Sequence, residues 1–162
     1  MVLHLSENQD FHVMALAAID LCRSGDWVAG LPRLSYVAKY RNGDELLPCV
    51  FFSYLGYGLA KRERKYQEGL DLCKTGVRLN EFDGEPWLYL AKTYMLFGRK
   101  KPAIEALDRG LQLDPEDRDL LRMRGEFGWR RRTVMSALPR AHAINRVTGG
   151  LRSLAMSRRE SP

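Results

Sequence analysis

The sequence predicts an all-α protein built from stacked helical hairpins. Apolar residues recur at three- and four-residue steps through most of the first 128 residues, which is the period of a helix with one buried face. Part of this pattern returns after about 34 to 35 residues, the interval of a helical repeat. The chain has 162 residues and is 45% hydrophobic, enough to bury one core or one short stack of repeats.

The clearest unit runs from Gly84 to Pro115. Its first helix is predicted from one apolar face, formed by Trp87, Leu90, Ala91 and Tyr94. A second helix has the same spacing at Ala103, Ile104, Leu107 and Leu111. The residues Phe97-Gly98-Arg99 between them are typical of a helix stop. Two short helices leave much of their apolar surface in water, so this hairpin needs stacked neighbours.

The order of these residues, closed by Asp114-Pro115, resembles one tetratricopeptide repeat. The resemblance extends over residues 11–128 and implies a right-handed α-solenoid of about three hairpins with a C-terminal capping helix, seven helices in all. The expected domain spans residues 11–131, with repeats near 11–44, 49–83 and 84–117 and a cap at 118–131. Residues 1–10 are expected to be a flexible segment. Residues 132–162 are expected to be a basic tail, partly disordered or docked on the solenoid.

The other units match this one less regularly. Pro32 lies inside a predicted helix, which should begin late or be kinked there. In the second unit the first helix matches at a shift of 35 residues and the second helix at 34, which puts one extra residue in the turn 61–65. After Pro115, Asp117 or Asp119 can cap a helix, and Leu121 stands at the Trp position. Small residues are expected where helices approach most closely, at Ala18, Gly56, Ala91 and Gly125.

Charge is unevenly distributed along the chain. Residues 129–162 carry eight Arg and one Glu, a net charge of +7, while residues 1–128 carry 18 basic and 19 acidic groups, a net charge of −1. The tail could contact phosphates of a nucleic acid or an anionic membrane, or it could be a solubilising terminus. The basic residues considered for such contacts are Arg130, Arg131, Arg132, Arg140, Arg146, Arg152, Arg158 and Arg159.

Nothing in the sequence favours catalysis. His4, His12 and His142 are scattered, and no spacing of Cys, His or acidic residues indicates a metal site, so we expect no enzyme, no cofactor and no metal. Cys22, Cys49 and Cys73 are expected to be reduced, buried thiols. No apolar run is long enough to cross a membrane and no secretory signal is evident, which favours a cytoplasmic protein.

The expected function is therefore protein binding, as an adaptor, scaffold or assembly factor. The family resemblance implies a partner groove on the first helices, at Ala15, Ile19, Cys22, Ser53, Tyr57, Ala60, Leu88, Lys92 and Met95. This surface suits an extended or helical apolar segment, although its members could instead serve packing. The Lys and Asn with which some members grip a terminal carboxylate are replaced by Ala15 and Ile19.

Several alternatives remain open at this point. The length and repeat number also resemble type III secretion chaperones. The Arg-rich tail could make the protein a factor that acts on nucleic acid or the ribosome, and repeats of this type can self-associate. An apolar stripe in the tail could also dock into the groove and mask it, at Ile144, Val147, Leu151 and Leu154.

Overall fold

A computed structural model of the chain describes residues 3–41 and 46–127, with side chains from Phe11 onward. These residues form seven α-helices and no strand, so the predicted all-α class is confirmed. The helices are α1 (Leu3–Arg23), α2 (Trp27–Tyr40), α3 (Phe51–Arg62), α4 (Tyr66–Leu79), α5 (Gly84–Leu96), α6 (Lys100–Leu113) and α7 (Arg118–Glu126).

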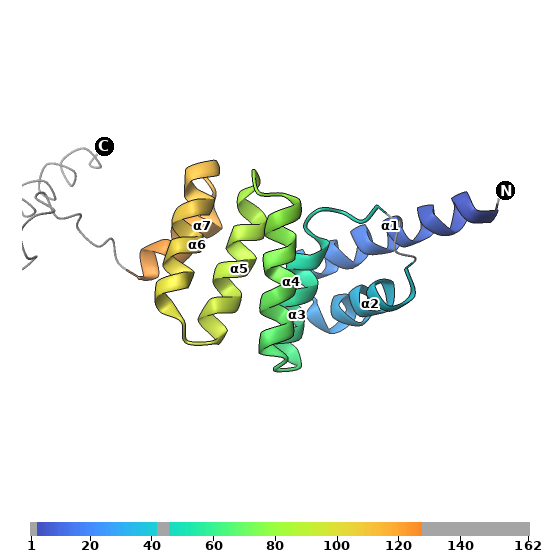
Figure 1. Ribbon diagram of the computed structural model, residues 1–162, viewed down its shortest axis with the longest axis horizontal. Coiled ribbons are helices and arrows are strands. Elements are labelled where there is room, and N and C mark those ends of the chain that lie inside the picture. The colour runs from blue at the N-terminus through green and yellow to red at the C-terminus, as the bar shows by residue number, and fades with distance from the viewer. Residues whose placement is uncertain (1–2, 42–45, 128–162) are drawn as a thin grey trace, which may run out of the picture. The chain divides into compact units, whose positions relative to one another are not determined.

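The first six helices pair in chain order as three hairpins, and α7 follows them (Figure 1). Each hairpin packs on the next one, and the first helices α1, α3 and α5 also contact one another in sequence. Helix α7 packs against α6 and α5 at the C-terminal end of this series. The helical-repeat architecture predicted from the sequence is therefore confirmed.

A three-residue turn joins the two helices of each hairpin. Two residues before each second helix the backbone has a positive φ, at Gly25 (99°), Arg64 (57°) and Gly98 (69°). Glycine adopts this conformation without strain, whereas Arg64 has a Cβ that disfavours it. The extra residue predicted in the second hairpin lies within its turn. Lys65 N donates to the carbonyl of Leu59, and this hydrogen bond spans one residue more than the corresponding bonds of the other two turns.

The helices of the second hairpin touch backbone to backbone. A Cβ placed on Gly56 would lie 2.4 Å from the carbonyl oxygen of Gly69, and a Cβ on Gly69 would lie 2.4 Å from that of Gly56. In the first hairpin Gly30 is similarly enclosed, by Cys22 and the carbonyl of Ala18. Small residues at these crossings are therefore a steric requirement of the hairpin.

The buried side chains form two clusters. The first joins α1, α2 and α3, and Tyr89 of α5 also belongs to it. The second joins α4, α5, α6 and α7. Tyr57 packs against both clusters, and this half-buried ring therefore connects the two parts of the core.

Three helices differ from the sequence-based expectation: α1 and α2 in where they begin, and α7 in which leucine is buried. Helix α1 begins at Leu3, within the segment expected to be flexible, where no Gly or Pro interrupts the sequence. Helix α2 does not begin late: it starts at Trp27 and contains Pro32. Pro32 and Val28, whose carbonyl loses the usual hydrogen bond, are both exposed, so water can replace that bond. In α7 the buried leucine is Leu120, which fills the space that Gly84 and Gly110 leave open, while Leu121 is exposed.

Two further expectations about single residues need correction. Gly125 is not at a close approach, since a Cβ there would meet nothing within 4 Å. Cys22 and Cys73 are buried as expected, but Cys49 is exposed because it lies in the connection before α3. All three cysteines are free thiols.

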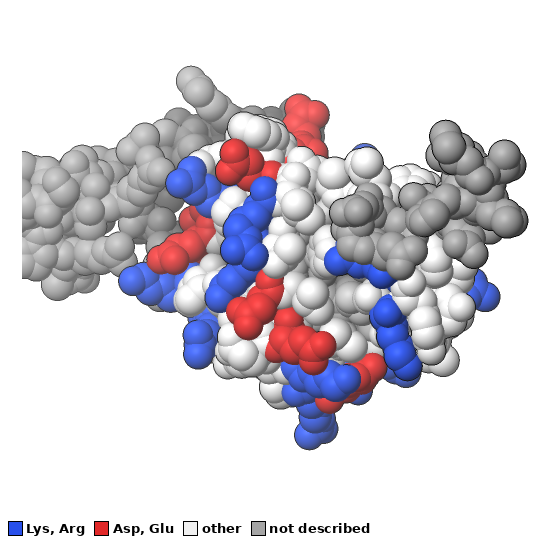
Figure 2. Space-filling model, turned by 45° about the vertical axis from the view of Figure 1, so that its right-hand side comes forward, with Lys and Arg blue, Asp and Glu red and all other residues white. Residues whose placement is uncertain are grey.

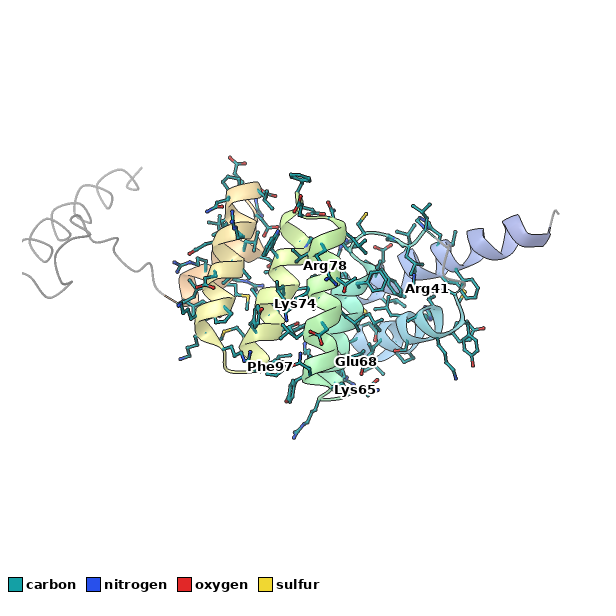
Figure 3. All side chains as sticks on the ribbon, in the orientation of Figure 1. Arg41, Lys65, Glu68, Lys74, Arg78 and Phe97 are labelled. Carbon is teal, nitrogen blue, oxygen red and sulfur yellow. The ribbon has the colours of Figure 1, made fainter. Side chains whose placement is uncertain are left out.

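The solvent side of the second hairpin is charged with both signs. Glu68, Lys74 and Arg78 extend outward from α4, and Arg41 at the end of α2 lies over the ring of Phe52 at 5.1 Å (Figure 3). Basic and acidic side chains are interspersed on the described face seen in Figure 2. None of the described helices is both long and apolar enough to cross a membrane.

The close approach of α3 and α4 can be tested by adding one methyl group. Gly56→Ala should lower the free energy of unfolding by about 1–3 kcal/mol, because the methyl overlaps the Gly69 carbonyl and the helices must separate. Gly125→Ala is the matched control and should be neutral or slightly stabilising, since the site is open. Urea denaturation followed by circular dichroism measures both, and equal effects of the two substitutions would contradict the steric argument.

Thiol labelling tests the burial of the cysteines. Burial raises the pKa of Cys22 to about 11, where Asp26 adds to the effect, and that of Cys73 to about 12. Because the thiolate is the reactive form, both should resist iodoacetamide in the native protein while Cys49 reacts. Mass spectrometry should find one label in buffer and three in denaturant. Rapid native labelling of Cys73 would show that the second core cluster is not packed as described.

Candidate functional site

The first helices of the three hairpins, Trp27 of α2 and the start of α7 line a cleft of about 440 Å³. Its lining contains aromatic rings together with both signs of charge. The lining residues are Cys22, Arg23, Gly25, Trp27, Tyr54, Tyr57, Lys61, Glu85, Leu88, Tyr89, Lys92, Asp117 and Asp119. Because every hairpin contributes, this cleft exists only when the whole stack is assembled.

Four aromatic rings from three hairpins meet at the base of this lining. Trp27 of the first hairpin lies 5.1 Å from Tyr57 and 6.0 Å from Tyr54 of the second, measured between ring centroids. Tyr54 lies 4.3 Å from Tyr89 of the third hairpin. Such contacts add about 0.5–1.5 kcal/mol each beyond the burial of area. We call Trp27, Tyr54, Tyr57 and Tyr89 the aromatic cluster.

A hydrogen-bond network joins the same three hairpins. The hydroxyl of Tyr54 donates to Oε1 of Glu85 at 2.5 Å and accepts from Nε of Arg23 at 3.2 Å. Nη2 of Arg23 donates to both carboxylate oxygens of Glu85 at 3.2 Å. Burial, followed by the hydrogen bond to Glu85, raises the pKa of Tyr54 well above its usual range. Tyr54 therefore stays a neutral donor, and the Glu85 carboxylate is bound by groups of the protein itself.

Two lysines lie over the rings of the cluster. Nζ of Lys61 is 5.7 Å from the Trp27 ring centroid and 5.4 Å from that of Tyr57. Nζ of Lys92 is 4.4 Å from the centroid of Tyr89. Burial lowers the pKa of Lys92, and the nearby Lys61 also lowers it. Arg23, the third cation of the lining, lies 5.7 Å from the Tyr54 centroid but is also paired with Glu85.

The nine groove residues predicted from the sequence divide into two groups. Cys22, Tyr57, Leu88 and Lys92 line the cleft. Ala15, Ile19, Ser53 and Ala60 are buried between helices and do not line it, while Met95 is half-buried outside it.

Helix crossings explain why these predicted groove residues are covered. A Cβ on Gly76 would lie 2.2 Å from Oγ of Ser53, and Ala60 touches Gly69 in the same way. Cys22 and Leu88, although they line the cleft, are themselves 2% and 4% exposed. The accessible lining of the cleft is therefore aromatic and charged, and the lining includes four of the nine residues predicted for the groove.

Sequence reasoning missed most of the aromatic cluster. Tyr54 and Tyr89 are 35 residues apart, the same shift that aligns Phe52 with Trp87, so their equivalence could have been found. Trp27 reaches beyond its own hairpin to rings of the second and third hairpins. That reach depends on how the hairpins stack, and no spacing in the sequence indicates it.

The basic tail lies outside the described residues. This holds for Arg130, Arg131, Arg132, Arg140, Arg146 and Arg152, and for the apolar stripe that could dock into the groove. Within the described ranges, no group of three or more His, Cys, Asp or Glu residues is placed to hold a metal ion.

Comparison with known proteins agrees with this architecture. Residues 84–127 match the family model described as tetratricopeptide repeat. Among solved structures, the Arabidopsis OM64 TPR domain is similar with a TM-score of 0.58 and 12% sequence identity, over 74% of this chain and 95% of that one. At this identity the likeness shows the fold alone. No curated protein sequence matches the chain.

The chain thus contains a tetratricopeptide repeat and has the fold of a tetratricopeptide-repeat domain, as the sequence resemblance implied. Proteins of this class are stacked helical hairpins that generally serve as non-enzymatic scaffolds for protein interaction.

The network around Tyr54 can be tested by removing one oxygen. Tyr54→Phe should lower the free energy of unfolding by about 1–2 kcal/mol, because Glu85 loses a short hydrogen bond in a partly buried site. Tyr36→Phe is the control, since Tyr36 is 49% exposed and lies outside the cleft; it should change stability by less than about 0.5 kcal/mol. Guanidinium denaturation measures both, and a neutral Tyr54→Phe would mean that the network does not stabilise the stack.

Proposed function

We propose that the protein is a non-enzymatic interaction module that holds a segment of a partner protein in the cleft formed by α1, α3, α5 and α7. The observation that carries this proposal is the composition of the lining, in which the aromatic cluster from three hairpins lies beside two lysines. Aromatic side chains with a polar edge are the residues that most often anchor protein interfaces.

The dimensions of the cleft favour a peptide segment over a folded domain. A space of about 440 Å³ accommodates a few side chains, within the range of sites that enclose small ligands. Tyr57 and Lys92 are half-buried and Lys61 is exposed, so a segment lying along the first helices can reach them without unfolding the stack. The partner segment thus crosses from the first hairpin towards α7.

An adaptor and a chaperone would both use such a site. The alternative of a nucleic-acid or ribosome factor rests on Arg130 to Arg152, which lie outside the described residues. A polyanion in the cleft would meet Glu85, Asp117 and Asp119 in its lining, which argues against nucleic acid binding there.

Peptide selection with the full chain tests the proposal. Peptides selected from a random displayed library should protect backbone amides of α3 and α5 near the cleft from hydrogen exchange, because these helices carry most of its lining. Tyr57→Ala should weaken the selected peptides by about tenfold or more, as truncation of an aromatic anchor does. Fluorescence anisotropy gives the affinities.

Tyr36→Ala is the matched control, because it removes an exposed tyrosine of α2 outside the cleft and should leave affinity unchanged within about twofold. Circular dichroism checks that both variants stay folded. Selected peptides that protect only α4 and α6 would place binding elsewhere, and the proposal would then be wrong regardless of the variants.

A further inference from the structure

Lys61 and Lys92 lack the partner that a cation in a cleft normally has. Among the described residues, neither ammonium group has a carboxylate within 4 Å or a hydrogen-bond acceptor. Each instead rests on aromatic ring faces of the cluster. Cation–π contacts hold the two side chains in place while leaving their N–H donors available to a ligand.

The acidic groups of the same cleft are already engaged. Glu85 is bound by Tyr54 and Arg23. Asp119 pairs with Arg122 at 2.7 Å, and Asp117 caps α7 by accepting from Leu120 N at 2.8 Å. The cleft therefore contains acids that are already paired or hydrogen-bonded within the protein, and two lysines without a carboxylate partner within 4 Å.

The surroundings of Lys92 also favour an incoming anion. Burial is the largest influence and lowers its pKa, and the cations Lys61 of α3 and Arg122 of α7 lower it further. Asp119 and Glu85 act in the opposite direction, but their charges are shared with arginines. An additional carboxylate beside Lys92 would compensate the partial loss of hydration of its ammonium group.

We propose that Lys61 and Lys92 together bind the side-chain carboxylate of a Glu or Asp in the partner segment. This inference rests on the proposed function and names the chemistry of its partner, a peptide with an acidic residue placed over the aromatic cluster. A single carboxylate suits two ammonium groups on ring faces, whereas the lining as a whole has three bases and three acids and so lacks the net positive charge that a chain of phosphates requires. The apolar residues that flank this Glu or Asp in the partner peptide lie against Tyr57 and Trp27.

Two labelled peptide libraries test this assignment with the full chain. Both are random heptapeptides, one with Glu fixed at the centre and the other with Gln, which is nearly the same shape without the charge. The Glu library should bind about tenfold more tightly, since charge-assisted hydrogen bonds are involved. Lys61→Met with Lys92→Met should abolish this preference, while retaining the apolar stems of both side chains.

The matched control is Lys100→Met with Lys101→Met, which removes the same charge from exposed positions at the start of α6 outside the cleft. This control should keep the preference for Glu. Because the basic tail is present in every variant, its attraction for acidic peptides cancels from the comparison. An equal loss in both double variants would show general electrostatics and overturn the assignment.

Carbodiimide coupling locates the contact directly. The reagent condenses a carboxylate with an amine that touches it, forming an amide as the carbodiimide takes up the water. It cannot join the peptide's carboxylate to a lysine of the tail, because the last lysine of the chain is Lys101. Peptides of the Glu library should be found on Lys61 and Lys92 by mass spectrometry. Coupling spread evenly over all lysines would contradict the assignment.

The possible outcomes distinguish the carboxylate site from the proposed function, which is peptide binding in the cleft. If both libraries protect the backbone amides of the cleft from hydrogen exchange and bind with equal affinity, the carboxylate site is wrong and peptide binding in the cleft still holds. If neither library protects the cleft, the proposed function fails together with the inference.

Discussion

The stack depends on the backbone contact between α3 and α4. A Cβ on Gly56 would overlap the carbonyl oxygen of Gly69, and a Cβ on Gly69 would overlap that of Gly56. The two helices can therefore approach this closely only because both residues lack a side chain. Tyr54 lies two residues from Gly56, about 200° around the helix, and so faces away from α4 towards the other first helices. The steric constraint on one side of α3 thereby orients the buried tyrosine on the other.

Tyr54 then connects stability with the cleft. Its ring packs against Trp27 and Tyr89, and its hydroxyl joins Arg23 to Glu85, so one side chain contacts all three hairpins. The same arrangement pairs Glu85, one of the three acids of the cleft lining, with Arg23. Structural hydrogen bonds therefore decide which charges the cleft can offer to a partner.

Sequence reasoning succeeded where local spacing decides the outcome. Helical periodicity and turn residues such as Gly25 and Gly98 predicted the hairpins, because the period of a buried face and a positive φ are properties of a few neighbouring residues. Spacing could not indicate that Ser53 and Ala60 are buried, since a groove position and a helix crossing can both be occupied by small residues. Burial alone distinguishes them, and it depends on a neighbouring helix distant in sequence.

The sequence by itself determined that this protein is a series of helical hairpins of the tetratricopeptide type with a capping helix and an Arg-rich C-terminal segment. Repeat spacing and composition can be read from the order of residues alone, without knowledge of tertiary contacts. Only the tertiary structure decided what the first helices present between them. Trp27, Lys61 and Lys92 come from different hairpins and meet through stacking geometry, which sets the ring contacts and leaves both ammonium groups without a described carboxylate within 4 Å.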